Sequence, residues 1–206
     1  MDIRWRGCLL EIIETIVLTV VIFFVFQTFI AQPYQIEQVS MENTVQPGQY
    51  VLVDKLSPHW SGYKRGEIIV FDPPPGYSES DGQNIPFIKR VIGVAGDVIE
   101  IKDNAVYVNG ARLDEPYVYE GQPTTPLTGQ SRWVVPDGEL FVLGDHREQS
   151  QDSRVFGPIP QSSVIGRAWL RYWPAGDIGI LGSASYPNVP NSPPPALLAP
   201  SPSAAP

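Results

Sequence analysis

The chain has 206 residues, which is enough for one domain with short attachments. Its 14 Lys and Arg against 22 Asp and Glu give a net charge of −8, so the chain is a poor ligand for the phosphates of nucleic acid. The single cysteine, Cys8, excludes a disulfide within the chain, and with only two histidines no Cys- or His-based metal site is expected.

An apolar segment near the N-terminus, residues 12–31, is long enough to cross a membrane as a helix. Its length of about twenty residues corresponds to roughly 30 Å of helix, the thickness of the hydrocarbon core. A buried helix of a soluble protein would show a polar face, but residues 15–26 carry no charge or amide. A cleaved signal peptide ending at Ala31 would need a small residue where Phe29 stands. The segment therefore predicts an uncleaved transmembrane anchor.

The basic residues on either side of this segment predict its orientation. Arg4 and Arg6 precede it, and the next basic residue after it is Lys55. The side with more Lys and Arg stays in the cytoplasm. We therefore expect a single-pass protein of the plasma membrane, in contact with the lipid bilayer. Residues 1–11 would be cytoplasmic, and everything after residue 31 would lie outside the cell.

The C-terminal residues 183–206 differ in composition from the rest. They are rich in Pro, Ala and Ser, carry no charge, and hold many of the 22 prolines of the chain. Such a composition buries too little apolar surface to offset the entropy of ordering, so a disordered tail is expected. Residues 32–182 then form the single folded domain.

Short runs rich in Val and Ile, separated by turn residues such as Pro47-Gly48 and Asn109-Gly110, fill this domain. They predict strands rather than helices, and no amphipathic helix of ordinary length follows the anchor. The expected fold is mainly β, an antiparallel sheet or barrel-like domain. The runs are residues 49–54, 66–72, 87–94, 97–101, 105–108, 139–143 and 164–172.

Three polar features stand out against this β pattern. Ser40 lies nine residues after the apolar segment, Lys89 lies inside an apolar strand, and a polar run at residues 144–154 follows another strand. Each has a purely structural interpretation when taken alone. Ser40 could belong to a packing turn, Lys89 could be a charge that protects a sheet edge, and the polar run could be a solvated turn with an ion pair.

Taken in order, the three features resemble the type I signal peptidases. The resemblance covers the membrane segment and nearly all of residues 32–173. It rests on three stretches of sequence: Ser40-Met41, the stretch from Lys89-Arg90 to Gly96-Asp97, and the run that begins with Gly144-Asp145. It implies a membrane-bound serine endopeptidase without a cofactor, expected to be a monomer, whose partners are preproteins with signal peptides. The family cuts these preproteins after small residues at positions −3 and −1.

The resemblance also implies the roles of the central residues. Ser40 would be the nucleophile and Lys89 its general base, with Ser150 orienting the lysine amine. A free lysine has a pKa of about 10.4, so the amine of Lys89 must be shifted towards its neutral form to accept a proton. Burial among apolar neighbours shifts it in this direction, because burial disfavours the ammonium form.

The resemblance assigns supporting roles to four charged residues and an oxyanion role to two groups. Asp152 with Arg154, and Asp145 with Arg147, would hold the polar run in place. The backbone N–H of Ser40 and the side-chain amide of Gln38 would bind the oxyanion. The chain departs from the usual family residues, without losing a catalytic group, at Gln38, Asn43, Ala95, His146 and Gln149.

Two other interpretations stay open at the level of sequence. One is a hydrolase that uses His146 as its base, although Asp145 is badly placed to orient its immediate neighbour and no G-x-S-x-G motif is present. The other is a catalytically dead, membrane-tethered binding module with the same fold. The aromatic stretch at residues 169–173 likewise has two interpretations, core packing and contact with the membrane interface.

Overall fold

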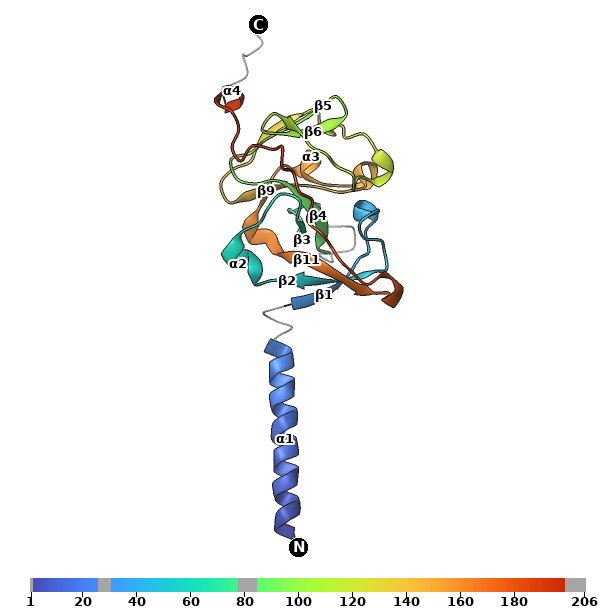
Figure 1. Cartoon of the computed structure of the whole chain (residues 1–206), viewed down its shortest axis with the longest axis vertical. Coiled ribbons are helices and arrows are strands. Elements are labelled where there is room, and N and C mark those ends of the chain that lie inside the picture. Colours follow the sequence, from blue (N-terminus) through green and yellow to red (C-terminus); the bar gives the residue numbers. More distant parts are fainter. Residues whose placement is uncertain (1, 26–30, 78–84, 199–206) are drawn as a thin grey trace.

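The computed structural model describes residues 2–25, 31–77 and 85–198. In this part of the chain the strands form two antiparallel sheets, one of eight strands and one of four. Figure 1 shows a long helix at the N-terminal end and a β domain beyond it. The expected mainly β, antiparallel fold is therefore confirmed.

The expected strands agree closely with the observed ones, and the helices after the first are single turns. The helices are α1 Asp2–Val25, α2 Ser57–Ser61, α3 Ser153–Phe156 and α4 Pro195–Leu198. The strands are β1 Ala31–Gln35, β2 Tyr50–Asp54, β3 Ile68–Phe71, β4 Phe87–Gly93, β5 Val98–Lys102, β6 Ala105–Val108, β7 Ala111–Arg112, β8 Arg132–Val134, β9 Glu139–Leu143, β10 Ile159–Pro160, β11 Val164–Trp173 and β12 Gly179–Ile180.

The larger sheet has the order β1-β2-β11-β3-β4-β9-β10, with β12 paired to β11. Its central strand β4 is buried along its whole length, which explains why its sequence is apolar without alternation. One face of β4 packs with Phe71, Leu140 and Val142. The other face contributes Ile88 and Ile92 to two further apolar clusters of the core. Lys89, at the third position of this strand, is therefore buried as well.

The smaller sheet has the order β7-β6-β5-β8 and lies at the end of the domain away from α1. Its β5–β6 hairpin turns through Asp103 and Asn104, which both adopt the positive φ of a type I′ turn. Ile99 and Ile101 of β5 pack with Trp133 and Phe141 in one apolar cluster. Strand β9 thus belongs to the larger sheet and also closes the core of the smaller one.

Helix α1 covers most of the segment that the sequence predicts as an anchor. Residues 26–30 of the predicted span 12–31 lie outside the described residues. In the part of the chain that is described, no helix combines the length and apolarity needed to cross a bilayer. The anchor remains a prediction.

The expectation of a disordered tail over residues 183–206 is wrong for residues 183–198. This segment runs from β12 along the domain to the smaller sheet (Figure 1). Tyr186 and Val189 are buried in the core cluster of that sheet, and the Tyr186 hydroxyl hydrogen-bonds to that of Tyr117. Burial raises the pKa of Tyr186 to about 12. Residues 199–206 lie outside the described residues.

Backbone contacts also attach this segment to the domain. Ala184 N donates to Gly66 O (3.1 Å), and a Cβ at Gly66 would lie 1.9 Å from Ala184 O, so only glycine permits this approach. Asn109 donates to the carbonyl of Pro190 (2.9 Å). The composition of the segment does not indicate these contacts. Two apolar side chains among many prolines, Tyr186 and Val189, are enough to attach it to the core cluster of the smaller sheet.

Removing this segment should destabilise the domain. Truncation after Gly182 exposes the cluster that Tyr186 and Val189 cover, and the loss of one large core side chain costs about 3–5 kcal/mol. We expect the Tm to fall by roughly 5–15 °C. Truncation after Leu198 is the matched control and should leave the Tm unchanged. Equal Tm values for the two truncations, measured by circular dichroism, would show that the segment does not contribute to stability.

Candidate active site

Ser40 lies in a short 3-10 turn, Val39–Met41, which packs against β4. Residues 38–45 are called the serine turn below. Met41 and Val45 bury their side chains in the core beneath it, which fixes the turn. Lys89, on β4, donates a hydrogen bond of 2.7 Å from Nζ to Ser40 Oγ. Both side chains are almost fully buried, with 3% and 1% of their surface exposed. Two residues that are 49 positions apart in sequence are thus in direct contact.

A cleft of about 480 Å³ opens beside this pair. Ser40, Lys89 and Ser150 line it, together with Gln38 and Phe87. Among the described residues, the Oγ of Ser150 and both polar atoms of the Gln38 side chain are buried without a hydrogen-bond partner. Buried polar atoms without partners are costly, so these groups are available to a ligand in the cleft.

Residues 144–154, called the polar loop below, close this side of the cleft. The loop begins at Gly144, where a Cβ would lie 2.2 Å from Ser150 Oγ and 2.6 Å from the carbonyl oxygen of Ser40. Any side chain at this position would collide with both groups. Gly144 therefore allows the serine turn, Ser150 and the polar loop to come together.

Asp145 is fully buried and binds Arg90 of β4 through two hydrogen bonds of 2.9 and 2.7 Å. Thr44 of the serine turn donates to the same carboxylate. Burial alone would lower the pKa of Arg90, but the hydrogen bonds and charge of Asp145 raise it above its ordinary value. The pair joins β4, the polar loop and the serine turn.

Asp152 and Arg154 form the second buried pair of the loop. Arg154 Nε lies 2.8 Å from Asp152 Oδ1, and its terminal nitrogen also donates to the carbonyl of Arg147 (2.6 Å). Asp152 caps α3 by accepting from the backbone N–H of Arg154, and it also accepts from the N–H of Gly144 (3.1 Å). The pair thus fixes both ends of the polar loop.

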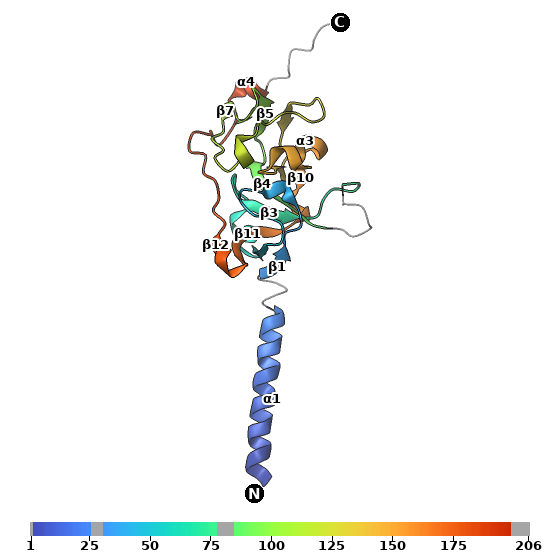
Figure 2. The same ribbon diagram turned by 90° about the vertical axis from the view of Figure 1, so that its right-hand side faces the viewer.

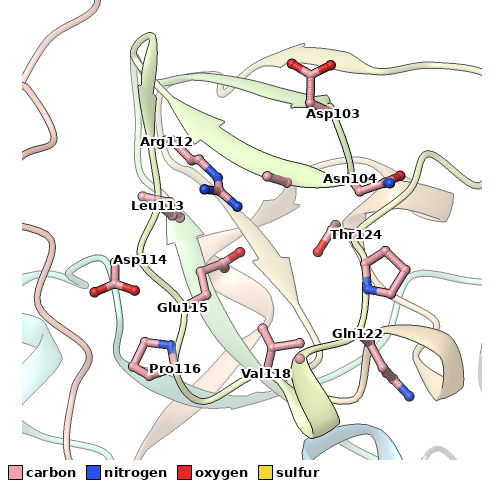
Figure 3. Close-up of a pocket in the computed structure, with 13 residues that line it drawn as sticks. Asp103, Asn104, Arg112, Leu113, Asp114, Glu115, Pro116, Val118, Gln122 and Thr124 are labelled. Atoms are coloured by element: carbon pink, nitrogen blue, oxygen red, sulfur yellow. The ribbon is translucent and has the colours of Figure 1, made fainter.

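Arg147 binds Glu115 rather than Asp145, through contacts of 3.1 and 2.6 Å. Burial alone would lower the pKa of Arg147, but the charge and hydrogen bonds of Glu115 raise it. Glu115 lies on the wall of a second cleft of about 620 Å³, formed by the smaller sheet and the segment that follows it (Figure 3). Although this cleft is larger, it does not include Ser40 or Lys89 in its lining.

His146 faces the serine turn from the polar loop. Its backbone N–H donates to Ser40 O (3.0 Å), and its Nδ1 lies 2.7 Å from a carboxylate oxygen of Glu42. Its ring stacks on Tyr119 with centroids 4.3 Å apart. Within the described ranges, the Ser40 hydroxyl is hydrogen-bonded to Lys89 and not to the ring of His146. In the same ranges, no group of three or more Cys, His, Asp or Glu side chains is arranged to hold a metal ion.

Comparison with known proteins identifies the family. The sequence model described as "Signal peptidase, peptidase S26" matches residues 9–173, most of the chain. The chain belongs to this signal peptidase family. It is 37% identical over 175 residues to signal peptidase I of Leptolyngbya laminosa, covering 84% of each chain. It is 36% identical over 180 residues to signal peptidase IB of Staphylococcus aureus, covering 81% of this chain and 90% of that one.

A crystal structure of a signal peptidase I from Enterococcus faecalis V583 is also similar. It shares 36% identity, covers 51% of this chain and 95% of that chain, and has a TM-score of 0.40. The family assignment confirms the predicted resemblance and the prediction that this signal peptidase is a serine endopeptidase. The relatives are similar along most of their own length, so the assignment concerns nearly the whole chain.

The structure of this signal peptidase adds two charged partners that the sequence analysis did not single out. Arg90 and Glu115 hold the polar loop through Asp145 and Arg147. Arg90 carried a detectable signal, since an arginine inside an apolar strand requires a buried partner. Glu115 carried no such signal, because its partner Arg147 lies 32 positions away in the sequence.

Proposed function

We propose that this protein removes signal peptides from exported preproteins, cutting after small residues at −3 and −1, with Ser40 as nucleophile and Lys89 as general base. The observation that carries the proposal is the buried contact of 2.7 Å between Lys89 Nζ and Ser40 Oγ at the side of an open cleft. A nucleophile within hydrogen-bond distance of its base is the arrangement that acyl-enzyme chemistry needs.

The surroundings of Lys89 favour a neutral amine. Only 1% of the residue is exposed, and burial disfavours the ammonium form. A neutral Nζ accepts the proton of Ser40 Oγ while the oxygen attacks the carbonyl carbon of the substrate. The protonated amine then returns this proton to the departing amine, and water hydrolyses the acyl-enzyme by the same route.

Two groups of the serine turn are available to stabilise the oxyanion. The backbone N–H of Ser40 is one donor, and the side-chain amide of Gln38 is the other. The Nε2 and Oε1 atoms of Gln38 are buried in the cleft wall without partners among the described residues. An amide without a partner can turn its N–H towards the negative charge that develops in the transition state.

A small cavity of about 20 Å³ adjoins the cleft at Gln38 and is also lined by Tyr34, Ile36, Ile85 and Ile88. An extended substrate would lie in the cleft itself, beside Ser40. Pairing with the exposed edge of β1 and the residues after it would supply backbone hydrogen bonds.

The proposal is tested by incubating the purified chain with a preprotein that carries a signal peptide. We expect one cleavage, and N-terminal sequencing of the product should place it directly after a small residue at the end of the signal peptide. Complete lack of turnover on a panel of preproteins would favour the alternative, a catalytically dead binding module with the same fold.

Ser150 should contribute strongly to the rate. Its hydroxyl lies in the same cleft as Lys89 and has no hydrogen-bond partner among the described residues, so we propose that it orients the amine. We expect Ser150→Ala to lower kcat by roughly 10- to 1,000-fold, and the wild-type rate to rise with pH as the Lys89 amine loses its proton. His146→Ala should cost far less. A normal Ser150→Ala enzyme together with an inactive His146→Ala enzyme would instead support a histidine base.

The proposal includes attachment to the lipid bilayer, with the catalytic domain outside the cell. Residues 12–31 supply the proposed anchor, and Arg4 and Arg6 its orientation. Exposed apolar side chains on β11 and in residues 178–180, at the end of the domain nearest α1 in Figure 2, suit contact with the membrane interface: Trp169, Trp173, Ile178 and Ile180.

This topology predicts the result of a protease experiment on intact cells. A protease added outside should degrade the domain from residue 32 onward and leave the residues before it inside. An impermeant thiol reagent should fail to label Cys8, because the cysteine precedes the anchor. Protection of the domain together with labelling of Cys8 would reverse the assignment.

A further inference from the structure

The side chains of three consecutive residues, Glu42, Asn43 and Thr44, fasten the serine turn to its surroundings. Thr44 joins the pair of Asp145 and Arg90 described above. We infer that Glu42 and His146 are positioning residues, which hold the serine turn against the polar loop in the geometry that the attack of Ser40 requires. This inference rests on the proposed function.

Two hydrogen bonds tie His146 to the serine turn, one from its backbone and one from its ring. The backbone N–H donates to Ser40 O at 3.0 Å, and Nδ1 lies 2.7 Å from Glu42 Oε2. An ionised carboxylate only accepts, so Nδ1 carries the hydrogen. The side-chain bond therefore fixes the same residue whose backbone holds the carbonyl of the nucleophile.

The ring of His146 is held in orientation from its other side. It stacks on Tyr119 at an interplanar angle of 22°, and only 9% of the residue is exposed. The backbone N–H of Tyr119 in turn donates to the carbonyl of Asp145 (2.9 Å), next to His146 in the polar loop. A ring fixed in this way directs its Nδ1–H at Glu42 without further loss of side-chain entropy.

Asn43 completes the attachment. It adopts φ +82°, a conformation that asparagine tolerates and that proline, fixed near −65°, cannot reach. Its side-chain amide donates to the carbonyl of Tyr117 (3.1 Å). Asn43 and Glu42 are thus neighbouring attachments of the serine turn, and the hydrogen bonds of both are called the joint below.

Loosening this joint should change the chemical step more than substrate binding. The carbonyl of Ser40 that His146 holds also lies beside Gly144 and Ser150, so a shift of His146 moves the nucleophile relative to its base. Small errors in the position of the reacting groups reduce kcat, whereas the substrate still binds in the same cleft.

The test measures kcat and KM on a signal-peptide substrate for His146→Ala, His146→Phe, Glu42→Ala and Glu42→Gln. His146→Phe keeps a ring to stack on Tyr119 but removes the hydrogen bond. We expect each variant except Glu42→Gln to lose about three- to tenfold in kcat at a KM within about twofold of wild type. Glu42→Gln should retain the rate, because its amide oxygen still accepts from Nδ1–H. His59→Ala, at an exposed histidine, is the matched control.

The double variant of Glu42→Ala and His146→Ala should be no slower than the slower single variant, because both changes break one hydrogen bond. Losses that multiply, a wild-type kcat in His146→Phe, or a lower Tm with unchanged kcat would overturn the positioning role. A wild-type chain without turnover would refute the proposed function, and this inference with it. An active wild-type chain with fully active variants would refute this inference alone.

Discussion

Replacing Lys89 with methionine should abolish cleavage while the domain stays folded. Methionine is of similar length and can occupy the buried position of Lys89 on β4, but it has no amine to accept the proton of Ser40. Removing a catalytic base or nucleophile commonly lowers kcat by roughly 10⁴- to 10⁶-fold, and Ser40→Ala should have an effect of the same size. The measurement is the cleavage of a preprotein followed by gel electrophoresis, with circular dichroism to check the fold.

The controls distinguish the loss of a catalytic unit from the loss of charge. Lys102→Met, at an exposed lysine of β5, should be fully active. The double variant of Ser40 and Lys89 should be no worse than either single variant, because the two residues act as a unit. Substantial activity in Lys89→Met at neutral pH would show that another group accepts the proton.

The substitution Gly144→Ala should also lower the rate strongly, although it removes no functional group. The added Cβ would lie 2.2 Å from Ser150 Oγ and 2.6 Å from Ser40 O, so either the polar loop or the serine turn must move. A displacement on the order of 1 Å of a reacting group costs about a hundredfold in rate, and we expect a loss of about this size in kcat.

A second glycine supplies the control for this experiment. Gly176 has no atom within 4 Å of its ideal Cβ, so Gly176→Ala should keep wild-type kinetics and stability. Overpacking at Gly144 should also lower the stability by about 1–3 kcal/mol, which thermal unfolding would detect. If Gly144→Ala were as active as Gly176→Ala, the close packing of the serine turn on the polar loop would not be needed for catalysis.

The strands that build the site could be predicted from the sequence because their apolar runs are bounded by turn residues. Strand β4 was expected at residues 87–94 and is observed at Phe87–Gly93, with Lys89 in its interior. The contact of Lys89 with Ser40 could be expected only from the resemblance. No pattern within either segment shows that residues 49 positions apart meet.

The tail could not be predicted because composition measures the average of a segment and not its few anchoring side chains. Tyr186 and Val189 pack into an apolar cluster, most of whose other members come from β5, β6, β8 and β9. The apolar cluster that these two side chains cover exists only once the smaller sheet has formed. The short strands β7, β10 and β12 could not be predicted for a similar reason. They are defined by their pairing with a neighbouring strand and not by a local sequence pattern.

The pairing of the charged residues in the polar loop was also only partly predictable. Asp152 and Arg154 lie two positions apart and form the expected pair. Asp145 and Arg147 have the same spacing but turn to different partners, Arg90 and Glu115. The difference arises because α3 begins after Asp152, and its first turn brings the carboxylate back towards Arg154, whereas the chain at Asp145 faces β4.

The most direct measurement of the dyad is the detection of the acyl-enzyme itself. A preprotein or signal-peptide substrate is mixed with the enzyme, the reaction is quenched in acid within one turnover, and the digested protein is analysed by mass spectrometry. The account predicts an ester of the signal peptide on the fragment that contains Ser40, and no ester in the Ser40→Ala or Lys89→Met enzyme. An ester on another residue, or rapid cleavage by Ser40→Ala, would contradict it.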